Sequence, residues 1–229
     1  MDAREPAISG FFEPVTGTVS YLVADPAAKV AMVVDPVLDY DWRAGRTSTS
    51  SIDRLAKAAE GYRIEAIVET HPHADHLSGA QELKKRAGGM IAIGAGIATV
   101  QRTWAPILDL EAGFPCDGSQ FDRLLADGER FALGAFEVAV MDTPGHTPAC
   151  ITLVVSHPAG GRKHAFVGDT LFMPDYGTAR TDFPGGSART LYRSIRRILS
   201  LPDDTKLYTA HDYQPGGRAV VFETTVGEQ

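Results

Sequence analysis

The chain has 229 residues, of which 44% are hydrophobic and 22% are charged, and its formal net charge is −7. This size suits one domain with a substantial core or two small ones, and we predict one domain over residues 1–229. The negative charge argues against a nucleic-acid partner, because phosphate binding requires a basic surface. The sequence contains no run of about 18 apolar residues, so we expect no membrane span. Residues 1–6 lack the apolar centre of a secretion signal, so we expect a cytoplasmic location.

The N-terminal part of the chain predicts a meander of three strands, over residues 11–15, 18–23 and 30–34. The polar segment 38–50 that follows is typical of a surface loop. Ser50 to Asp53 then has the spacing of a helix capping box. The helix that it begins is expected to bury a face made of Leu55, Ala58, Ala59 and Tyr62.

An unusual stretch, Thr70-His71-Pro72-His73-Ala74-Asp75-His76, follows an apolar run at 64–69 that reads as a strand. Polar side chains gain little from such crowding unless they share a ligand, so the stretch indicates metal binding. His71 and His73 lie two apart on extended backbone and can point the same way. Asp75 and His76 are expected at the start of a helix, because apolar residues recur at helical spacing from Leu77 onward. The stretch therefore predicts two clusters of donors, one for each of two metal positions.

The second half of the chain predicts further strands at 90–93, 131–141, 151–155, 165–167 and 206–210. Helical patterns cover residues 97–108 and a segment that begins at its N-cap, Ser187, while 111–120 reads as a loop. Strands followed by helices, twice over, predict an α+β fold in which two β-sheets pack together with helices on the outer faces. A functional site would lie where the strand ends and their loops gather.

Three later residues share the strand-end position of the histidine-rich stretch: His146, Asp169 and His211. Pro144 and Gly145 predict a tight turn that presents the imidazole of His146. Other reactive or charged residues have no such context. We expect Cys116 and Cys150 to be free thiols, since they have no metal-ligand spacing. We assign no role to two further histidines and to a solvated helix face, which comprise His157, His164, Arg189, Arg193, Arg196 and Arg197.

The pattern His-x-His-x-Asp-His, then Gly-His, Gly-Asp and a strand-terminal His, resembles the metallo-β-lactamase superfamily across nearly the whole chain. The resemblance implies an αββα four-layer sandwich of two mixed sheets flanked by helices. It also implies one metal held by His71, His73 and His146, a second held by Asp75, His76 and His211, and Asp169 as a bridge. Asp35, after the third strand, matches an aspartate that supports the ligand loop in this superfamily.

Segments 70–78, 143–147 and 177–183 resemble more closely the persulfide dioxygenases, also called sulfur dioxygenases, and the β-lactamase-hydrolase-like proteins. The Arg-Thr-Asp-Phe element at 180–183 discriminates best. This likeness implies one Fe(II) per chain, held by His71, His146 and Asp169. Two imidazoles and one carboxylate leave open positions on iron for O2 and substrate. His73, Asp75, His76 and His211 would then hydrogen-bond water, substrate or the ligands.

The implied reaction is the oxidation of glutathione persulfide, or a related low-molecular-weight persulfide, by O2 to sulfite and glutathione. Arg180 is a candidate for gripping a glutathione carboxylate, and Tyr176 for lining the same pocket. An ion pair of Arg180 with Asp175 or Asp182 is the alternative. The resemblance is compatible with a homodimer.

The competing interpretation is a di-zinc hydrolase of the glyoxalase II or lactonase type, because all seven ligands of a two-metal site are present. Only 18 residues follow His211, too few for the helical glutathione-binding domain of glyoxalase II. Dioxygenase relatives often continue further beyond this histidine as well, so we expect that the chain is shortened at its C-terminus. A non-catalytic binding module on the same fold is a third interpretation, although such modules usually lose ligands.

Overall fold

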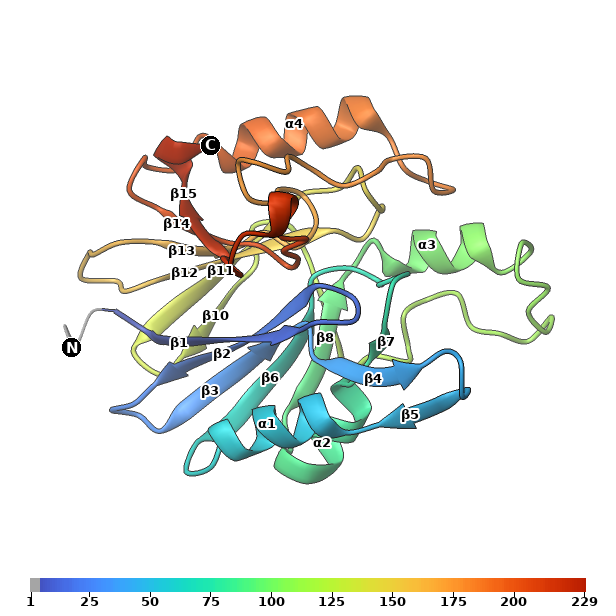
Figure 1. Ribbon diagram of the computed structural model, residues 1–229, viewed down its shortest axis with the longest axis horizontal. Helices are drawn as coiled ribbons and strands as arrows, with labels where there is room; N and C mark the ends of the chain where they lie inside the picture. The colour runs from blue at the N-terminus through green and yellow to red at the C-terminus, as the bar shows by residue number, and fades with distance from the viewer. Residues whose placement is uncertain (1–4) are drawn as a thin grey trace.

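The computed structural model describes residues 5–229 and is built around two six-stranded β-sheets that face each other (Figure 1). The first sheet has the order β1-β2-β3-β6-β8-β9. Its strands are β1 (Ala7–Glu13), β2 (Thr18–Asp25), β3 (Val30–Val34), β6 (Arg63–Glu69), β8 (Met90–Gly94) and β9 (Arg123–Leu125). The β3, β6, β8 and β9 strands run parallel to one another, and the others pair antiparallel. The carboxyl ends of the parallel strands therefore meet at one edge of the sheet.

The second sheet has the order β10-β11-β12-β13-β14-β15. Its strands are β10 (Arg130–Leu133), β11 (Phe136–Asp142), β12 (Ile151–Ser156), β13 (His164–Phe166), β14 (Lys206–Tyr208) and β15 (Glu223–Thr225). Only β13 and β14 pair in parallel. Because Asp169 follows β13 and His211 follows β14, this parallel pair brings two of the candidate ligands to the same edge.

The main core lies between the two sheets. All eight residues of β2 are buried, since both faces of this strand are covered. Tyr21 and Val23 point into the space between the sheets, where they meet Phe166 of the second sheet. The alternate residues Leu22 and Ala24 point outward to the helices. The two-residue period of a strand thus divides β2 between two cores.

Helices cover the outer faces, and the αββα arrangement expected from the sequence is confirmed (Figure 1). On the first sheet, α1 (Ser50–Ala58) and α2 (Ala80–Ala87) pack through Leu55 and Leu83. On the second, α4 (Ala188–Ile198) packs through Ile198, and Ser187 caps it by accepting from the Thr190 amide. The remaining helix, α3 (Ile97–Trp104), follows β8. Within residues 5–229, no helix is both long and apolar enough to span a bilayer.

The segment predicted as a loop at 38–50 instead forms a hairpin of β4 (Val37–Asp41) and β5 (Arg46–Ser48). Together with β7 (Leu77–Ser78) it makes a small third sheet in the order β5-β4-β7. The prediction was wrong because these short strands are mostly exposed and lack the alternation of apolar and polar residues that marks a strand. Long-range pairing decides instead, since Val37 and Leu38 pair with Ser78 and Leu77.

The same pairing corrects the prediction for the residues after His73. Leu77 and Ser78 belong to β7, so α2 begins only at Ala80, and Asp75 and His76 lie in the loop rather than on a helix. The predicted capping box of α1 was also wrong. Thr49 is the N-cap residue and makes no side-chain cap. The carboxylate of Asp39 supplies one from the hairpin, because it accepts 2.8 Å hydrogen bonds from both the amide and the hydroxyl of Ser51.

Smaller differences lie at element ends. Ala58, predicted on the buried face of α1, is exposed, whereas Leu55 and Ala59 are buried. The helix predicted over 97–108 ends at Trp104. The pattern missed three-residue strands β9 and β15 and the short 3-10 helices η1 (Pro215–Gly217) and η2 (Val226–Glu228). Elements of three residues are too short for a periodic signal.

Candidate metal centre

His71 lies directly after β6 and is held by a chain of hydrogen bonds that ends at Asp35. The Thr70 hydroxyl donates to Asp35 Oδ2 at 2.7 Å and lies 3.0 Å from His71 Nδ1. A hydroxyl has one proton, so Thr70 accepts from Nδ1–H of His71. This fixes the tautomer in which Nε2 of His71 carries a free lone pair, which is the form of imidazole that binds a metal.

Asp35 stands at the end of β3 in a left-handed conformation, with φ of 49°. Its Oδ1 atom accepts from the Thr70 amide at 2.7 Å. Burial would raise the pKa of this carboxyl, but His73, His71 and the Thr70 amide together hold the pKa below its ordinary value. The residue therefore anchors the start of the histidine-rich loop as a buried anion, and this geometry suits the supporting role expected for it.

His146 reaches the same place from the loop between β11 and β12. Gly145 has φ of +141°, and a Cβ atom on it would lie 2.4 Å from the Cα of Leu191 in α4. The loop can pass this close to the helix only because residue 145 is a glycine. The Nδ1 atom of His146 donates a 2.8 Å hydrogen bond to the carbonyl oxygen of Arg180. The tautomer of His146 is thereby fixed, and Nε2 is left free for a ligand.

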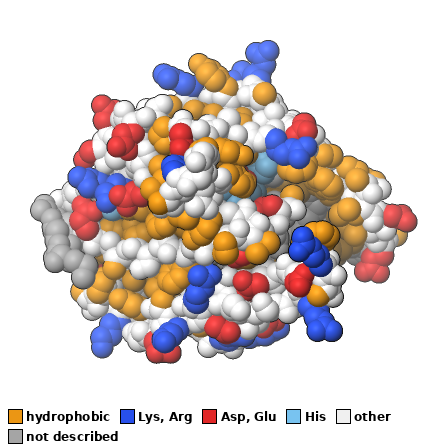
Figure 2. Space-filling view, viewed as in Figure 1, with side chains coloured by type: hydrophobic (Ala, Val, Ile, Leu, Met, Phe, Trp, Pro, Cys, Tyr) orange, Lys and Arg blue, Asp and Glu red, His pale blue; other side chains and the backbone are white. Residues whose placement is uncertain are grey.

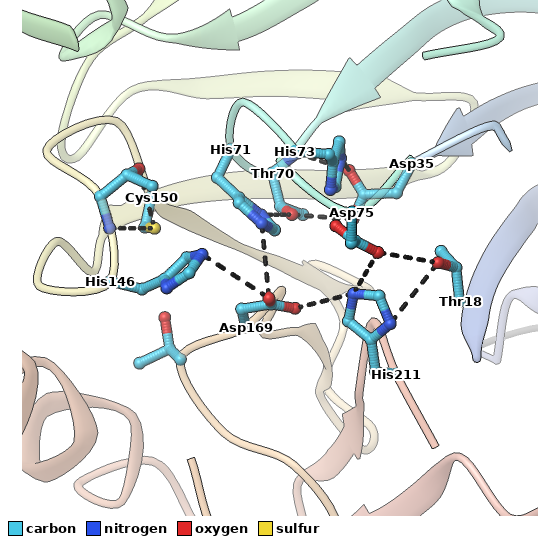
Figure 3. Close-up of polar contacts among 12 residues, drawn as sticks. Thr18, Asp35, Thr70, His71, His73, Asp75, His146, Cys150, Asp169 and His211 are labelled. Carbon is cyan, nitrogen blue, oxygen red and sulfur yellow. Dashed lines mark hydrogen bonds and ion pairs between the residues drawn. The ribbon is translucent and has the colours of Figure 1, made fainter. Parts of the chain in front are cut away.

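Asp169 follows β13 and lies between three imidazoles (Figure 3). Its Oδ2 atom is 3.5 Å from Nε2 of His71 and 3.7 Å from Nε2 of His146, and its Oδ1 atom is 3.4 Å from Nε2 of His211. Burial would raise the pKa of Asp169, but the three imidazoles together hold it below its ordinary value. The carboxylate is therefore ionised, as a metal ligand must be.

His73 is held by two buried acids rather than by one. Its Nε2 atom lies 3.1 Å from Asp35 Oδ1 and 3.0 Å from Glu69 Oε2. The hydroxyl of Ser78 donates to the other oxygen of Glu69. Glu69 did not figure among the predicted site residues, although an acid that ends an apolar strand four residues before a histidine could have suggested it. Together the acids favour a proton on Nε2 of His73, and its buried Nδ1 atom, which has no hydrogen-bond partner, is left as the possible ligand atom.

The remaining predicted ligands stand on the other side of Asp169. His211 lies between Asp169 and Asp75, with its Nε2 atom 3.5 Å from Asp75 Oδ2. Its Nδ1 atom is 3.5 Å from the hydroxyl of Thr18, the first residue of β2. His76 turns its Nδ1 atom to the Leu77 carbonyl at 3.1 Å. All four segments that the sequence analysis singled out thus converge on one site, as Figure 3 shows for most of these residues.

The donor atoms at this site suit a metal. Among residues 5–229, six buried side-chain nitrogen or oxygen atoms have no hydrogen-bond partner, and five belong to the site. They are Nε2 of His71, His76 and His211, Nδ1 of His73 and Oδ1 of Asp169. Buried polar groups rarely remain unpaired without a reason. Three sets of side chains each bring donor atoms within 4.8 Å of one another: His71, His146 and Asp169; His73, Asp75 and His76; Asp35, Glu69 and His73.

The two candidate substrate contacts lie at the rim. Arg180 is exposed, and its guanidinium pairs with both oxygens of Asp182 at 2.6 and 2.7 Å. Of the two alternative ion pairs, the one with Asp182 is therefore present, whereas Asp175 pairs with Arg218. Tyr176 is half exposed and packs against Tyr213, whose ring stacks on His211 at a centroid distance of 5.3 Å. An aromatic wall thus flanks His211.

The cysteines take no part in the donor set. Both Cys116 and Cys150 are free thiols, as expected. Cys150 lies next to the His146 loop, where its sulfur accepts from the Thr147 amide at 3.3 Å. Burial raises the pKa of Cys150 to about 12, so the group is a protonated thiol rather than the thiolate that a metal would bind.

Comparison with known proteins agrees with this geometry. The family model described as "Metallo-beta-lactamase superfamily" matches residues 14–211, which include every candidate ligand. The chain belongs to this superfamily. A probable metallo-hydrolase of Burkholderia pseudomallei is 54% identical over 97% of this chain and 78% of its own length. A beta-lactamase hydrolase-like protein of Xylella fastidiosa is 50% identical over 99% of this chain, which spans only 51% of that relative.

The superfamily members that resemble the chain also include persulfide dioxygenases. Human mitochondrial persulfide dioxygenase ETHE1 is 33% identical over 88% of this chain and 66% of its own length. The crystal structure of ETHE1 from Myxococcus xanthus superposes with a TM-score of 0.72 at 26% identity, covering 97% of this chain and 80% of that one. The αββα sandwich is therefore the metallo-β-lactamase fold.

Proposed function

We propose that the protein is a persulfide dioxygenase that uses one Fe(II) per chain, held by His71, His146 and Asp169. The observation that carries this proposal is the meeting of two imidazoles and one carboxylate, with donor atoms within 4.8 Å of one another. This donor set is typical of non-haem iron sites that keep positions open. The similarity to ETHE1 proteins supports the same choice.

The chain's own residues prepare the site. Thr70 and the Arg180 carbonyl fix the tautomers of His71 and His146, so both imidazoles present Nε2 lone pairs without rearrangement. Fe(II) would supply the electron transfer to O2 that protein side chains cannot provide. At the edge of the donor set, His211 is placed to donate a hydrogen bond to a sulfur anion, and Asp75 is placed to accept one from a water molecule.

The proposed substrate is glutathione persulfide or a related small persulfide. The outer sulfur loses the electrons that O2 gains, its bond to the carrier sulfur breaks, and water supplies the third oxygen of sulfite. The carrier leaves as the free thiol, and the protons go to solvent. We propose Tyr176 as a substrate contact. Arg180, the other contact predicted from the sequence, would have to release Asp182 before it could bind a substrate carboxylate, so we expect it to contribute little to binding.

Metal analysis and O2 uptake test the proposal. Protein produced with iron should contain about one iron per chain and consume O2 only when glutathione persulfide is present. His71→Ala should lose both iron and uptake, whereas His157→Ala, outside the site, should lose neither. Uptake that persists in His71→Ala would refute the ligand assignment.

A di-zinc hydrolase is the second candidate, and one observation favours it. His73, Asp75 and His76 form a separate group with donor atoms within 4.8 Å of one another, as a second metal would need. A zinc pair would activate a water molecule for hydrolysis. The similarity to a probable metallo-hydrolase agrees with this alternative. Two zinc ions per chain and turnover of a glutathione thioester or a lactone, without O2 uptake, would replace the dioxygenase with the hydrolase.

A further inference from the structure

A groove of about 1310 Å³ leads away from the candidate metal centre. Its inner end is formed by His73, Asp75 and His76, and it runs between the β4–β5 hairpin and the turn after β1. In Figure 2, histidine atoms show through a hollow near the middle of the face, and basic side chains project near the hairpin end. A molecule in this groove could therefore extend from the hairpin to His73, whose ring centroid lies 4.2 Å from that of the proposed iron ligand His71.

Three of the four acids that line the groove accept hydrogen bonds from neighbouring groups, and the fourth, Asp75, lies at its inner end. Glu13 accepts from the amides of Val15 and Thr16 at 2.9 and 2.8 Å. Asp41 accepts from two backbone amides of its own turn at 2.9 and 3.1 Å. Asp39 caps α1 through Ser51, as described above. These three carboxylates complete turns and a helix end, through hydrogen bonds from backbone amides and from the hydroxyls of Thr16 and Ser51.

The arginines of the hairpin are not engaged in the same way. Among residues 5–229, no carboxylate lies within 4.0 Å of the guanidinium of Arg43 or Arg46, although both residues line the groove. Arg43 stands 5.0 Å from the ring centroid of Trp42, which is 68% exposed. By contrast, the guanidinium of Arg180 forms an ion pair with Asp182. Two arginines without a carboxylate partner and an exposed indole therefore lie together on the hairpin.

We propose that this groove binds the carrier part of the substrate, a small peptide thiol with free carboxylates, an inference that rests on the proposed function. Arg43 and Arg46 bind the carboxylates, because a guanidinium matches a carboxylate with two parallel hydrogen bonds. The indole of Trp42 packs against the peptide part. The sulfur end then lies at the inner end of the groove, next to His71, His146 and Asp169.

Direct binding tests the site independently of turnover. S-methylglutathione keeps both carboxylates and cannot form a persulfide, so it reports carrier binding alone. The chain has only two tryptophans, Trp42 in the groove and Trp104 beside Phe183. Binding should quench fluorescence in Trp104→Phe, where Trp42 is the only emitter, and should leave the fluorescence of Trp42→Phe unchanged. Quenching that is carried by Trp104 would place the carrier on the Arg180 side and overturn the proposal.

Charge removal gives the second test. The double variant Arg43→Gln/Arg46→Gln should bind S-methylglutathione about tenfold more weakly, with unchanged metal content. The matched control is Arg193→Gln, an exposed arginine on α4. Equal affinity in the double variant and the control, or no binding to the unaltered protein, would overturn the groove as the carrier site.

Kinetics separate this inference from the proposed function. In the dioxygenase assay, the double variant should show about a tenfold higher KM for glutathione persulfide at unchanged kcat. Its kcat/KM for a carboxylate-free persulfide, made from 2-mercaptoethanol, should equal that of the unaltered protein. If O2 uptake is absent in every form while arginine-dependent binding remains, the dioxygenase fails and the groove stands. If O2 uptake is present but the double variant keeps the KM of the unaltered protein, the dioxygenase stands and the groove fails as the carrier site.

Discussion

The Nδ1 atom of His146 donates a 2.8 Å hydrogen bond to the backbone carbonyl of Arg180. The guanidinium of the same arginine turns away and pairs with Asp182. Arg180 thus serves the site through its main chain, while its side chain lies 62% exposed at the rim. The Arg-Thr-Asp-Phe element that distinguishes the sequence therefore has a positioning task that does not depend on the identity of the side chain.

Replacing Arg180 with alanine should then have a small effect on substrate binding. The carbonyl remains, so we expect unchanged iron content, and loss of an exposed pair should change KM for glutathione persulfide by less than about twofold. Steady-state O2 uptake measures this. The Arg43→Gln/Arg46→Gln protein, with its larger expected change, is the comparison. A larger rise in KM for Arg180→Ala than for that double variant would assign the carboxylate contact to Arg180 instead.

Glu69 offers a test of the number of metals. Substitution of Glu69 by glutamine removes one of the two acids that orient His73, but it leaves the acid that supports His71. Iron content should stay at about one per chain. In a zinc titration of metal-free protein, the second equivalent of zinc should bind at least about tenfold more weakly, which is the loss of metal affinity expected when the support of a ligand is altered.

The control for Glu69→Gln is Glu65→Gln, on the same strand, where the carboxylate pairs with the exposed Arg63. This change should affect neither metal. Loss of iron in Glu69→Gln would mean that His73 belongs to the iron site. Unchanged affinity for the second zinc would mean that His73 is not a ligand at all.

The sequence analysis placed the candidate ligands at strand ends, and the structure brings these residues together, because the end of a strand signal can be recognised locally. Buried strands such as β3 and β6 are apolar runs that end abruptly at polar residues. The hairpin of β4 and β5 escaped prediction because its strands are exposed and depend on pairing with β7, 39 residues away in the case of Leu38 and Leu77. The cap of α1 by Asp39 was missed for a related reason, since Asp39 and Ser51 meet through the tertiary fold and local spacing carries no record of it. The contact of Glu69 with His73 was also missed, although its four-residue spacing could have suggested it.

His164 provides a pH test away from the metal centre. It is buried at the start of β13, with Nε2 2.6 Å from Glu5 and Nδ1 3.1 Å from the Tyr208 hydroxyl. Burial and the charge of Lys206 lower its pKa and together outweigh Glu5 and Glu223, which raise it, so the folded chain binds this proton less tightly than the unfolded chain. The stability that depends on neutral His164 is complete above the unfolded pKa of about 6.5 and declines as pH falls below it.

We therefore expect His164→Gln to flatten the fall in unfolding free energy between about pH 7 and pH 5. Denaturant unfolding of metal-free protein across that range would show it as a shallower slope. His157→Gln, on the preceding loop, should keep the slope of the unaltered protein. A steeper slope in His164→Gln would reverse the sign of the shift assigned to His164.

Gly145 links the stability of the fold to the position of His146. In Gly145→Ala, the added Cβ would lie 2.4 Å from both the Cα and the amide nitrogen of Leu191, at φ of +141°. Either the loop or α4 must move, and we expect a loss of about 3 kcal/mol in unfolding free energy from strain and overpacking. Gly160→Ala is the matched control, since its φ is +92° and a Cβ there meets nothing within 4 Å. The control should lose only about 1 kcal/mol, the backbone term alone.

Unfolding is measured on protein treated with a chelator, so that the stability of the fold is separated from metal binding. Because the displaced loop carries His146, the iron affinity of Gly145→Ala should fall as well, whereas that of Gly160→Ala should not. Equal losses of stability in the two variants would mean that α4 yields freely and does not brace the His146 loop.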